Sequence, residues 1–433
     1  MNQRKFITFL EKLTHSLNPD KITDIAKHED FCVRQRRITP FKLVTCLIAV
    51  MASGTIESVA DIQRRYCEWS DSNITYRAFH NQFSKPEFPE FMREVLSSLL
   101  TDWLQPALAF PVGHSFHQFK QILIQDGSSF AVKDSLKKSF PGRFKTISPA
   151  AVELQVTMDL LADQPCSISL TPDTASERDY LPDPQALSGR LLLVDRGYFD
   201  LAWFQRLQDG GGFYIARAKN NINPTVVSAH REDGKMLKHV QGKELKTVQG
   251  KLLKRQRTEL IVAWKKGKTT ITARLVAFWI KREKKFSWLI TNLPQTQFSL
   301  EDVSEAYRLR WQIELLFKEW KSYANLRRFD TGKESVATGL IWAAIAAALM
   351  KRFICHSAQR ILDKALSTRK TAMCCTVTFC DTMRGIMRFD RKATELHARK
   401  LIVFLGLHAG RAHPKRDCTS GRFSLGLQLC EVA

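Results

Sequence analysis

Two short apolar runs, each followed at once by an aspartate, constrain the fold of this chain more than any other feature. The run "ILIQ" precedes Asp126, and the run "LLLV" precedes Asp195. Short apolar runs with turn-forming residues at their ends are typical of buried strands, which occur in sheets covered on both faces. Glycine follows each acid within two residues, so we expect each strand to end at its acid. The sequence therefore predicts an α/β sheet whose edge carries both carboxylates.

A carboxylate at the end of a buried strand has two explanations. An isolated charge that loses its water costs free energy, so two such acids at one sheet edge favour a functional site. The alternative is that each acid begins a turn or caps a following helix, for which aspartate is well suited. For either acid alone the structural role is the simpler explanation, whereas a pair joined by a third acid favours a site.

The rest of the chain divides into regions with different patterns. Helical patterns dominate the start, and β-rich segments such as "ELIVAWKKGKTTITARLVAFWI" follow the two aspartates. Helical patterns return after Pro294. We therefore expect five regions, namely a helical 1–110, an α/β 118–210, a β-rich 211–294, a helical 295–360 and a basic 361–433.

Three short helices are predicted within the first region. They correspond to "TPFKLVTCLIAVMA", "TIESVADIQRRYCEW" and "NITYRAFHNQFSK". Thr75 is placed to cap the third helix, whose exposed face would carry Arg77, His80 and Asn81. A polar third helix is typical of a helix-turn-helix unit, and an ordinary helical bundle explains the pattern equally well.

The charge balance points to a polyanionic partner. The chain has 66 Lys and Arg against 43 Asp and Glu, a net charge of +23. Because the cations are interleaved with aromatic residues, nucleic acid is favoured over a merely solvated basic surface. The ten cysteines show no spacing typical of disulfides or zinc ligands, which fits reduced thiols in the cytoplasm. The apolar run 339–350 is too short to cross a bilayer and is expected to be a buried helix.

A third acid lies in the stretch "YRLRWQIELLFKEWKS", which reads as one helix. On a helix, Tyr307, Arg310, Glu314 and Lys321 fall within about 60° of one another, opposite the apolar stripe. The alternative is that Glu314 only forms ion pairs with Arg310 or Lys318 on a solvated face.

Three carboxylates with basic neighbours suit one chemistry. Two divalent ions, about 3.5–4 Å apart, can stabilise the attacking and leaving oxygens of a phosphoryl transfer. Carboxylates are the ligands that Mg²⁺ and Mn²⁺ prefer. Arg310 and Lys321 would then hold a phosphate of the strand being cut, and Tyr307 would add a hydroxyl donor.

The spacing Y-x2-R-x3-E-x6-K resembles the YREK signature of the insertion-sequence-four (IS-four) family of DDE transposases. The segments "IQDGSS" and "VDRGYF" are similar to that family's blocks around its first and second aspartates. The long gap between Asp195 and Glu314 matches a catalytic core carrying an inserted β domain. The resemblance covers roughly 118–325 well and is weak in the N-terminal helices and after 360.

The resemblance implies an RNase-H-like catalytic core, made of 118–210 and 295–360, interrupted by the β-rich insertion. The helical N-terminal region would bind DNA, and the C-terminal region would serve dimerisation or DNA contact. Asp126, Asp195 and Glu314 would be the catalytic residues and the ligands of two Mg²⁺ or Mn²⁺ ions.

The implied reaction is cut-and-paste transposition, in which a strand is nicked, a hairpin forms and opens, and the freed end joins target DNA. Tyr307, Arg310 and Lys321 would bind the phosphate of the non-transferred strand. The partners would be double-stranded DNA, as terminal inverted repeats and target, and a second copy of the chain in a synaptic homodimer. The setting would be the bacterial cytoplasm, in association with the nucleoid and with no membrane.

Trp288, in "FSWLITNLP", matches a tryptophan block of that family, where the ring stacks on a base flipped out of the duplex. The alternative for Trp288 is a packing role in the core. Two rival functions also stand beside transposition. One is an RNase-H-like nuclease that cuts DNA without joining it, and the other is an inactive, transposase-derived DNA-binding protein.

Overall fold

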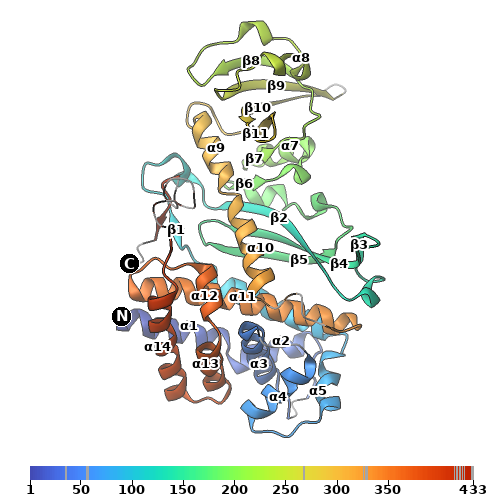
Figure 1. Ribbon diagram of the computed structural model, residues 1–433, viewed down its shortest axis with the longest axis vertical. Coiled ribbons are helices and arrows are strands. Elements are labelled where there is room, and N and C mark those ends of the chain that lie inside the picture. The colour runs from blue at the N-terminus through green and yellow to red at the C-terminus, as the bar shows by residue number, and fades with distance from the viewer. Residues whose placement is uncertain are drawn as a thin grey trace.

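The computed structural model describes residues 1–34, 37–54, 58–266, 269–324, 326, 330–413, 415, 418, 421, 423 and 425–430. The molecule is elongated, with most helices gathered at one end and a large sheet extending from them toward the other (Figure 1). The fold is therefore mixed α/β with a helical N-terminal region, as predicted.

Most strands belong to one ten-stranded sheet. At its centre β6 (Leu191–Val194) runs parallel to both neighbours, β2 (Ile122–Ala131) and β7 (Phe213–Arg217). The other strands pair antiparallel and are β3 (Pro141–Phe144), β4 (Ser148–Asp159), β5 (Gln164–Pro172), β8 (Thr225–Arg231), β9 (Thr258–Lys266), β10 (Thr269–Ile280) and β11 (Lys285–Thr291).

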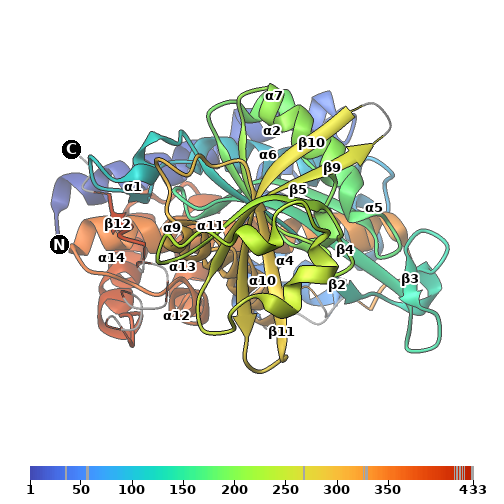
Figure 2. The same cartoon turned by 90° about the horizontal axis from the view of Figure 1, so that it is seen from above.

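The strand order shows how the β-rich region joins the rest. Across the sheet it is β5-β4-β2-β6-β7-β11-β10-β9-β8, with β3 also paired to β4. The region 211–294 contributes strands β7 to β11, which extend the same sheet, and β7 belongs to the parallel centre. Seen down the long axis, the strands fan out around it, as the accumulated twist of a large sheet requires (Figure 2).

The two faces of the sheet are buried in different cores. Ile124, Leu193 and Ile215 belong to the large core formed with the helices at the base of the molecule. Val194 and Trp288 belong to a second core, which includes residues of the small helix α7 (Leu201–Asp209). Both faces are covered, which explains why the central strands read as continuous apolar runs.

The helical base combines the two ends of the chain (Figure 1). Its longest helix, α11 (Glu334–Leu362), includes the apolar run 339–350 and packs against α3 (Pro40–Ser53) and α6 (Phe88–Trp103). By length and composition α11 could cross a bilayer, but 94% of its apolar window is buried inside the protein, as in a core helix. The other helices of the base are α1 (Gln3–Ser16), α2 (Pro19–His28), α4 (Val59–Ser70), α5 (Tyr76–Phe83), α12 (Thr368–Cys374), α13 (Val377–Met387) and α14 (Arg391–His408).

Three short elements lie outside these groups. The short helix α8 (Leu245–Val248) lies among the strands of the β-rich region. The strands β1 (Leu108–Ala109) and β12 (Gln428–Leu429) pair with each other away from the main sheet.

The stretch 307–322 is not one helix, which corrects the sequence-based expectation. It is divided between α9 (Leu300–Arg308) and α10 (Trp311–Tyr323). At the junction the amides of Arg310 and Ile313 donate to carbonyls three residues earlier, so the chain tightens into a turn before the helix resumes. Tyr307 and Glu314 therefore lie on different helices.

A buried ion network fixes α10 to its surroundings. The Arg352 guanidinium of α11 donates to Asp163, in the turn between β4 and β5, at 2.8 Å and to Glu319 of α10 at 3.2 Å. His356 Nε2 lies 2.9 Å from the second Asp163 oxygen. All four side chains are buried, so their charges depend on one another. The network holds α10 against α11 and the sheet.

Candidate active site

The two aspartates come together because their strands are parallel neighbours. The pairing of β2 with β6 ends at Gln125 opposite Val194, so Asp126 and Asp195 occupy the next level. Neighbouring strands lie about 4.8 Å apart, which places the two residues side by side. By strand alternation both side chains point to the face of Ile124 and Leu193, where α9 and α10 pack.

Asp126 does not lie at the end of its strand, which corrects the expectation for that acid. β2 continues to Ala131 because its other neighbour, β4, pairs with it across the whole length. Only the pairing with β6 stops at Gln125. Asp195, by contrast, directly follows the last residue of β6.

The turn between α9 and α10 brings the third acid to the other two. Tyr307 donates its hydroxyl to Asp195 Oδ1 at 3.0 Å. The Arg310 guanidinium donates through one nitrogen to Asp126 Oδ2 at 2.9 Å and through the other to Glu314 Oε1 at 2.6 Å. The three carboxylates are therefore gathered around Tyr307 and Arg310, although they are far apart in the sequence.

Lys321, on α10, contacts the strand that carries Asp126. Its ammonium donates to the backbone carbonyl of Ser129 on β2, at 2.6 Å. This contact joins α10 to β2 beyond Asp126. The Lys321 side chain therefore lies beside the acids, toward the C-terminal end of β2.

Burial and mutual repulsion set the charge of the site. Burial raises the pKa of Asp126 to about 6 with help from the Asp195 and Glu314 charges, although the Arg310 guanidinium and the Gly127 amide act in the opposite direction. Burial and the Asp195 charge also raise the pKa of Tyr307, which keeps its hydroxyl protonated as a donor. The acids therefore need a cation close by, and Arg310 supplies it.

The donor set fits divalent ions, but the arrangement is not yet that of a metal site. Asp126, Asp195 and Glu314 offer the hard carboxylate oxygens that Mg²⁺ and Mn²⁺ prefer. Among the residues that the structure describes, no three acidic, histidine or cysteine side chains stand close enough to share an ion. The Arg310 guanidinium lies between Asp126 and Glu314, so an ion shared by these two acids requires that it withdraw.

Trp288 is not brought to this site. Its side chain is 3% exposed and belongs to the second core, on the opposite face of the sheet from Asp126 and Asp195. Its ring packs beside that of Phe286, with centroids 5.7 Å apart. The placement favours the packing role that the sequence left open.

We expect Trp288→Leu to lower the free energy of unfolding by about 1–3 kcal/mol, because a large core side chain is shortened. The yields of nicked and hairpin products should fall by the same factor. Both are measured on gels after incubation with Mg²⁺ and DNA that carries the terminal inverted repeats, called end DNA below. Phe286→Leu is the matched control, because this partner ring is shortened in the same way. Selective loss of the hairpin in Trp288→Leu would restore the base-stacking role.

Two features of the site were not predicted from the sequence. The pairing of Arg310 with Asp126 depends on tertiary structure and leaves no local signal. Arg217 is the last residue of β7 and stands at the level of Asp195 beside β6, and its charge acts on Tyr307. The run "FYIAR" could have revealed Arg217, because it ends in a charge as the two aspartate runs do.

Comparison with known proteins identifies the family. The profile of the transposase DDE domain matches residues 117–350. The chain is 23% identical to the transposase for insertion sequence element IS231F of Bacillus thuringiensis subsp. israelensis, over 85% of this chain and 83% of that protein. It is 22% identical to the transposase for insertion sequence element IS1151 of Clostridium perfringens, over 83% of each.

A solved structure of a piggyBac transposase synaptic complex with hairpin DNA aligns with a TM-score of 0.47 and 11% identity, over 91% of this chain and 84% of that chain. The matching profile covers more than half of the sequence, from before β2 to the middle of α11. It thus includes all three acids, and the chain belongs to the transposase DDE domain family.

Proposed function

We propose that this protein is a transposase that moves an insertion sequence by cut-and-paste transposition. The observation that supports the proposal is the convergence of Asp126, Asp195 and Glu314 around Arg310 and Tyr307, with Lys321 bonded to the same strand as Asp126. The family assignment and the net charge of +23 support it. Phosphodiester cleavage and joining need acids of this kind with a basic surround.

The catalytic core is proposed to be RNase-H-like. The supporting feature is the strand order β5-β4-β2-β6-β7, in which three consecutive antiparallel strands are followed by two parallel ones. Strands β8–β11 then form the insertion, which extends the sheet between β7 and α9. This assignment explains why the third acid comes so late in the chain.

Each residue of the site has a proposed task. Asp126, Asp195 and Glu314 would hold two Mg²⁺ or Mn²⁺ ions, which when bound activate the attacking oxygen and stabilise the leaving one. Arg310 and Lys321 would hold a phosphate of the non-transferred strand. Tyr307, kept protonated, donates a hydrogen bond and orients Asp195. The mostly buried positions of these side chains keep the site organised before DNA arrives.

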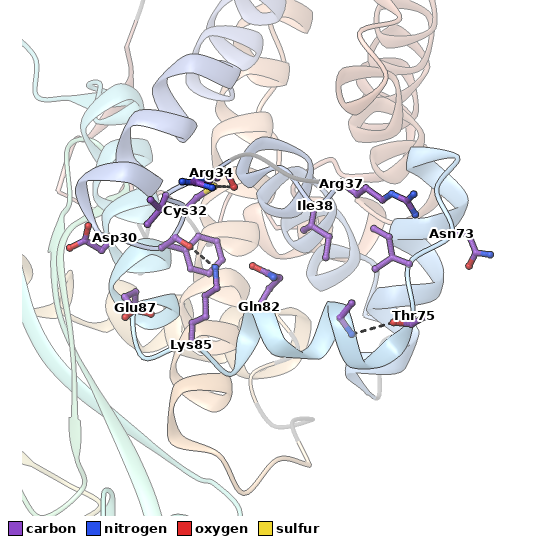
Figure 3. A pocket seen from close by; sticks show the side chains of 14 residues that line it. Asp30, Cys32, Arg34, Arg37, Ile38, Asn73, Thr75, Gln82, Lys85 and Glu87 are labelled. Atoms are coloured by element: carbon purple, nitrogen blue, oxygen red, sulfur yellow. Dashed lines mark hydrogen bonds between the residues drawn. The ribbon is translucent and has the colours of Figure 1, made fainter.

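The N-terminal helices are proposed to bind DNA. The three predicted helices are present as α3, α4 and α5, and Thr75 caps α5 by accepting from the Ala78 amide at 3.4 Å. Arg77 and Asn81 on α5 are exposed. Beside α5 lies a hollow of about 1030 Å³ whose rim carries Arg34 and Arg37 (Figure 3). Asp30 and Glu87 also line the hollow, where Arg34, Arg37 and Lys85 outnumber them, and cations beside exposed polar residues suit the DNA backbone and base edges.

The test of the proposed function uses the DNA that flanks the reading frame. Incubation of these ends with the protein and Mg²⁺ should give nicks, hairpins and products joined to a second DNA. Nicks without joined products would favour the nuclease, and binding without nicks would favour the inactive DNA-binding protein. A synaptic homodimer, also proposed, would appear as complexes holding two ends.

Binding to end DNA should weaken steeply with salt. Lys and Arg that neutralise phosphates release condensed counterions, so the logarithm of affinity falls by about 0.9 per phosphate contact for each decade of salt. For six or more contacts we expect a loss of about 10³ between 50 and 200 mM salt. Fluorescence anisotropy at graded KCl measures the slope, with a matched series in potassium glutamate to separate anion effects. An affinity that does not change with salt would contradict phosphate contacts.

A further inference from the structure

Arg310 holds the place that a bound metal ion would need. One guanidinium bridges Asp126 and Glu314, at 2.9 and 2.6 Å, and neutralises two of the three acids. The Arg310 side chain is only 14% exposed, and those of Asp126 and Glu314 are 19% and 31% exposed. The bridge is therefore a partly buried, hydrogen-bonded ion pair rather than a loose surface contact.

The bridge and a shared metal ion exclude each other. The bridge occupies Asp126 Oδ2 and Glu314 Oε1, the Gly127 amide donates to Asp126 Oδ1 at 3.0 Å, and the guanidinium supplies the positive charge that a shared ion would otherwise bring. A metal ion that binds the free protein must therefore displace Arg310. The displaced guanidinium is then left half-buried without a partner, which is costly.

A DNA phosphate removes that cost. Guanidinium binds phosphate through two parallel hydrogen bonds, about as well as it binds carboxylate. Arg310 stands at the turn between α9 and α10, so its side chain can swing from the acids to a strand lying over them. The Tyr307 ring, 6.0 Å from the guanidinium carbon, lines its position.

We infer that Arg310 couples DNA to metal: it blocks the acids until a phosphate of the DNA draws it away, and only then do Asp126 and Glu314 take up an ion. The inference rests on the proposed function and adds a regulation of the same site. The Arg310 bridge keeps the active site free of metal when no DNA is bound. By thermodynamic linkage, metal must tighten DNA binding by the same factor by which DNA tightens metal binding.

The test is the affinity of the protein for Mn²⁺ alone, measured by electron paramagnetic resonance of the free ion. Arg310→Gln removes the blocking charge, so it should bind Mn²⁺ about tenfold more tightly than the parent chain. Arg310→Lys, which keeps the charge but cannot span both acids, should fall between the two. Arg308→Gln is the matched control, because Arg308 has the same charge on α9 and pairs with Glu305. Equal or weaker Mn²⁺ binding in Arg310→Gln overturns the inference.

A second measurement adds a short DNA duplex of arbitrary sequence at saturating concentration. In the parent chain the duplex should tighten Mn²⁺ binding by about tenfold or more, and in Arg310→Gln most of this gain should be lost. An equal gain in both proteins overturns the coupling. With the duplex bound, Asp126→Asn tests the metal site apart from the coupling: if it fails to weaken Mn²⁺ binding, the proposed site itself is wrong. If it does weaken Mn²⁺ binding and Arg310→Gln does not tighten it, only the coupling is wrong.

Discussion

Asp126→Asn should abolish metal-dependent nicking of end DNA, with a loss of about 10³-fold or more. The substitution keeps the shape of the side chain and removes the charge that binds the ion. Transition-state stabilisation by the metal contributes several kcal/mol, and about 4 kcal/mol corresponds to 10³-fold in rate. Single-turnover cleavage of a labelled duplex with Mg²⁺ measures the effect directly.

DNA binding is the internal control for Asp126→Asn, because the acid contributes no attraction to phosphate. Measured without divalent metal, affinity at fixed salt should stay within about threefold of the parent value. Asp134 is an exposed acid that follows β2 in the chain. The variant Asp134→Asn removes an equal charge and should cleave DNA normally. A variant at Asp126 that nicks as well as the parent chain would show that Asp126 is not a metal ligand.

Glu314→Gln should have a similarly large effect, a loss of about 10³-fold in cleavage, while the fold is retained. The side chain is 31% exposed and its one described ion pair is with Arg310, so its structural contribution is small. We expect the free energy of unfolding to change by less than about 1 kcal/mol. Thermal melts and single-turnover cleavage on the same preparation give both quantities.

The control for Glu314→Gln is Glu301→Gln on α9, an acid that is 71% exposed and lies outside the site. It should neither slow cleavage nor lower the melting temperature. A collapsed melt in Glu314→Gln would assign this acid to the stability of α10 instead. The salt-bridge role that the sequence left open would then be correct.

The fold could be predicted where local pattern determines it. The apolar runs before Asp126 and Asp195 form β2 and β6, and the run 339–350 forms the buried part of α11. The end of β2 could not be predicted, because pairing with β4 carries the strand on to Ala131 although the apolar run stops earlier. Long-range pairing overrides local sequence at such positions.

The site could be predicted as a set of residues but not as an arrangement. The spacing of Tyr307, Arg310, Glu314 and Lys321 identifies the side chains, and the structure gathers all four near the two aspartates. A regular helix would place Tyr307 and Glu314 on one axis, whereas the turn at Arg310 separates them. The Arg310–Glu314 half of the bridge is the i,i+4 pair that helix periodicity already suggested, whereas the Arg310–Asp126 half depends on tertiary packing that no periodicity reveals.

Trp288 is a residue whose sequence motif does not predict its position in the structure. The motif around it suggests a base-stacking role, but the face on which a strand residue points depends on register. Its strand, β11, pairs with β7 so that Leu289 shares the face of the acids and Trp288 points away. A sequence pattern does not determine this choice, because Trp288 and Leu289 are both apolar and either could face the large core.

Three acids that are distant in the sequence are proposed to hold divalent ions against a DNA strand. The most direct test is a crystal structure of the protein with a DNA duplex and Mn²⁺, with the ions located by their anomalous scattering. The account predicts two peaks at about 2.1 Å from oxygens of Asp126, Asp195 and Glu314, with Arg310 turned onto a phosphate. Peaks bound by other residues, or Arg310 still bridging Asp126 and Glu314 in the complex with DNA and metal, would contradict it.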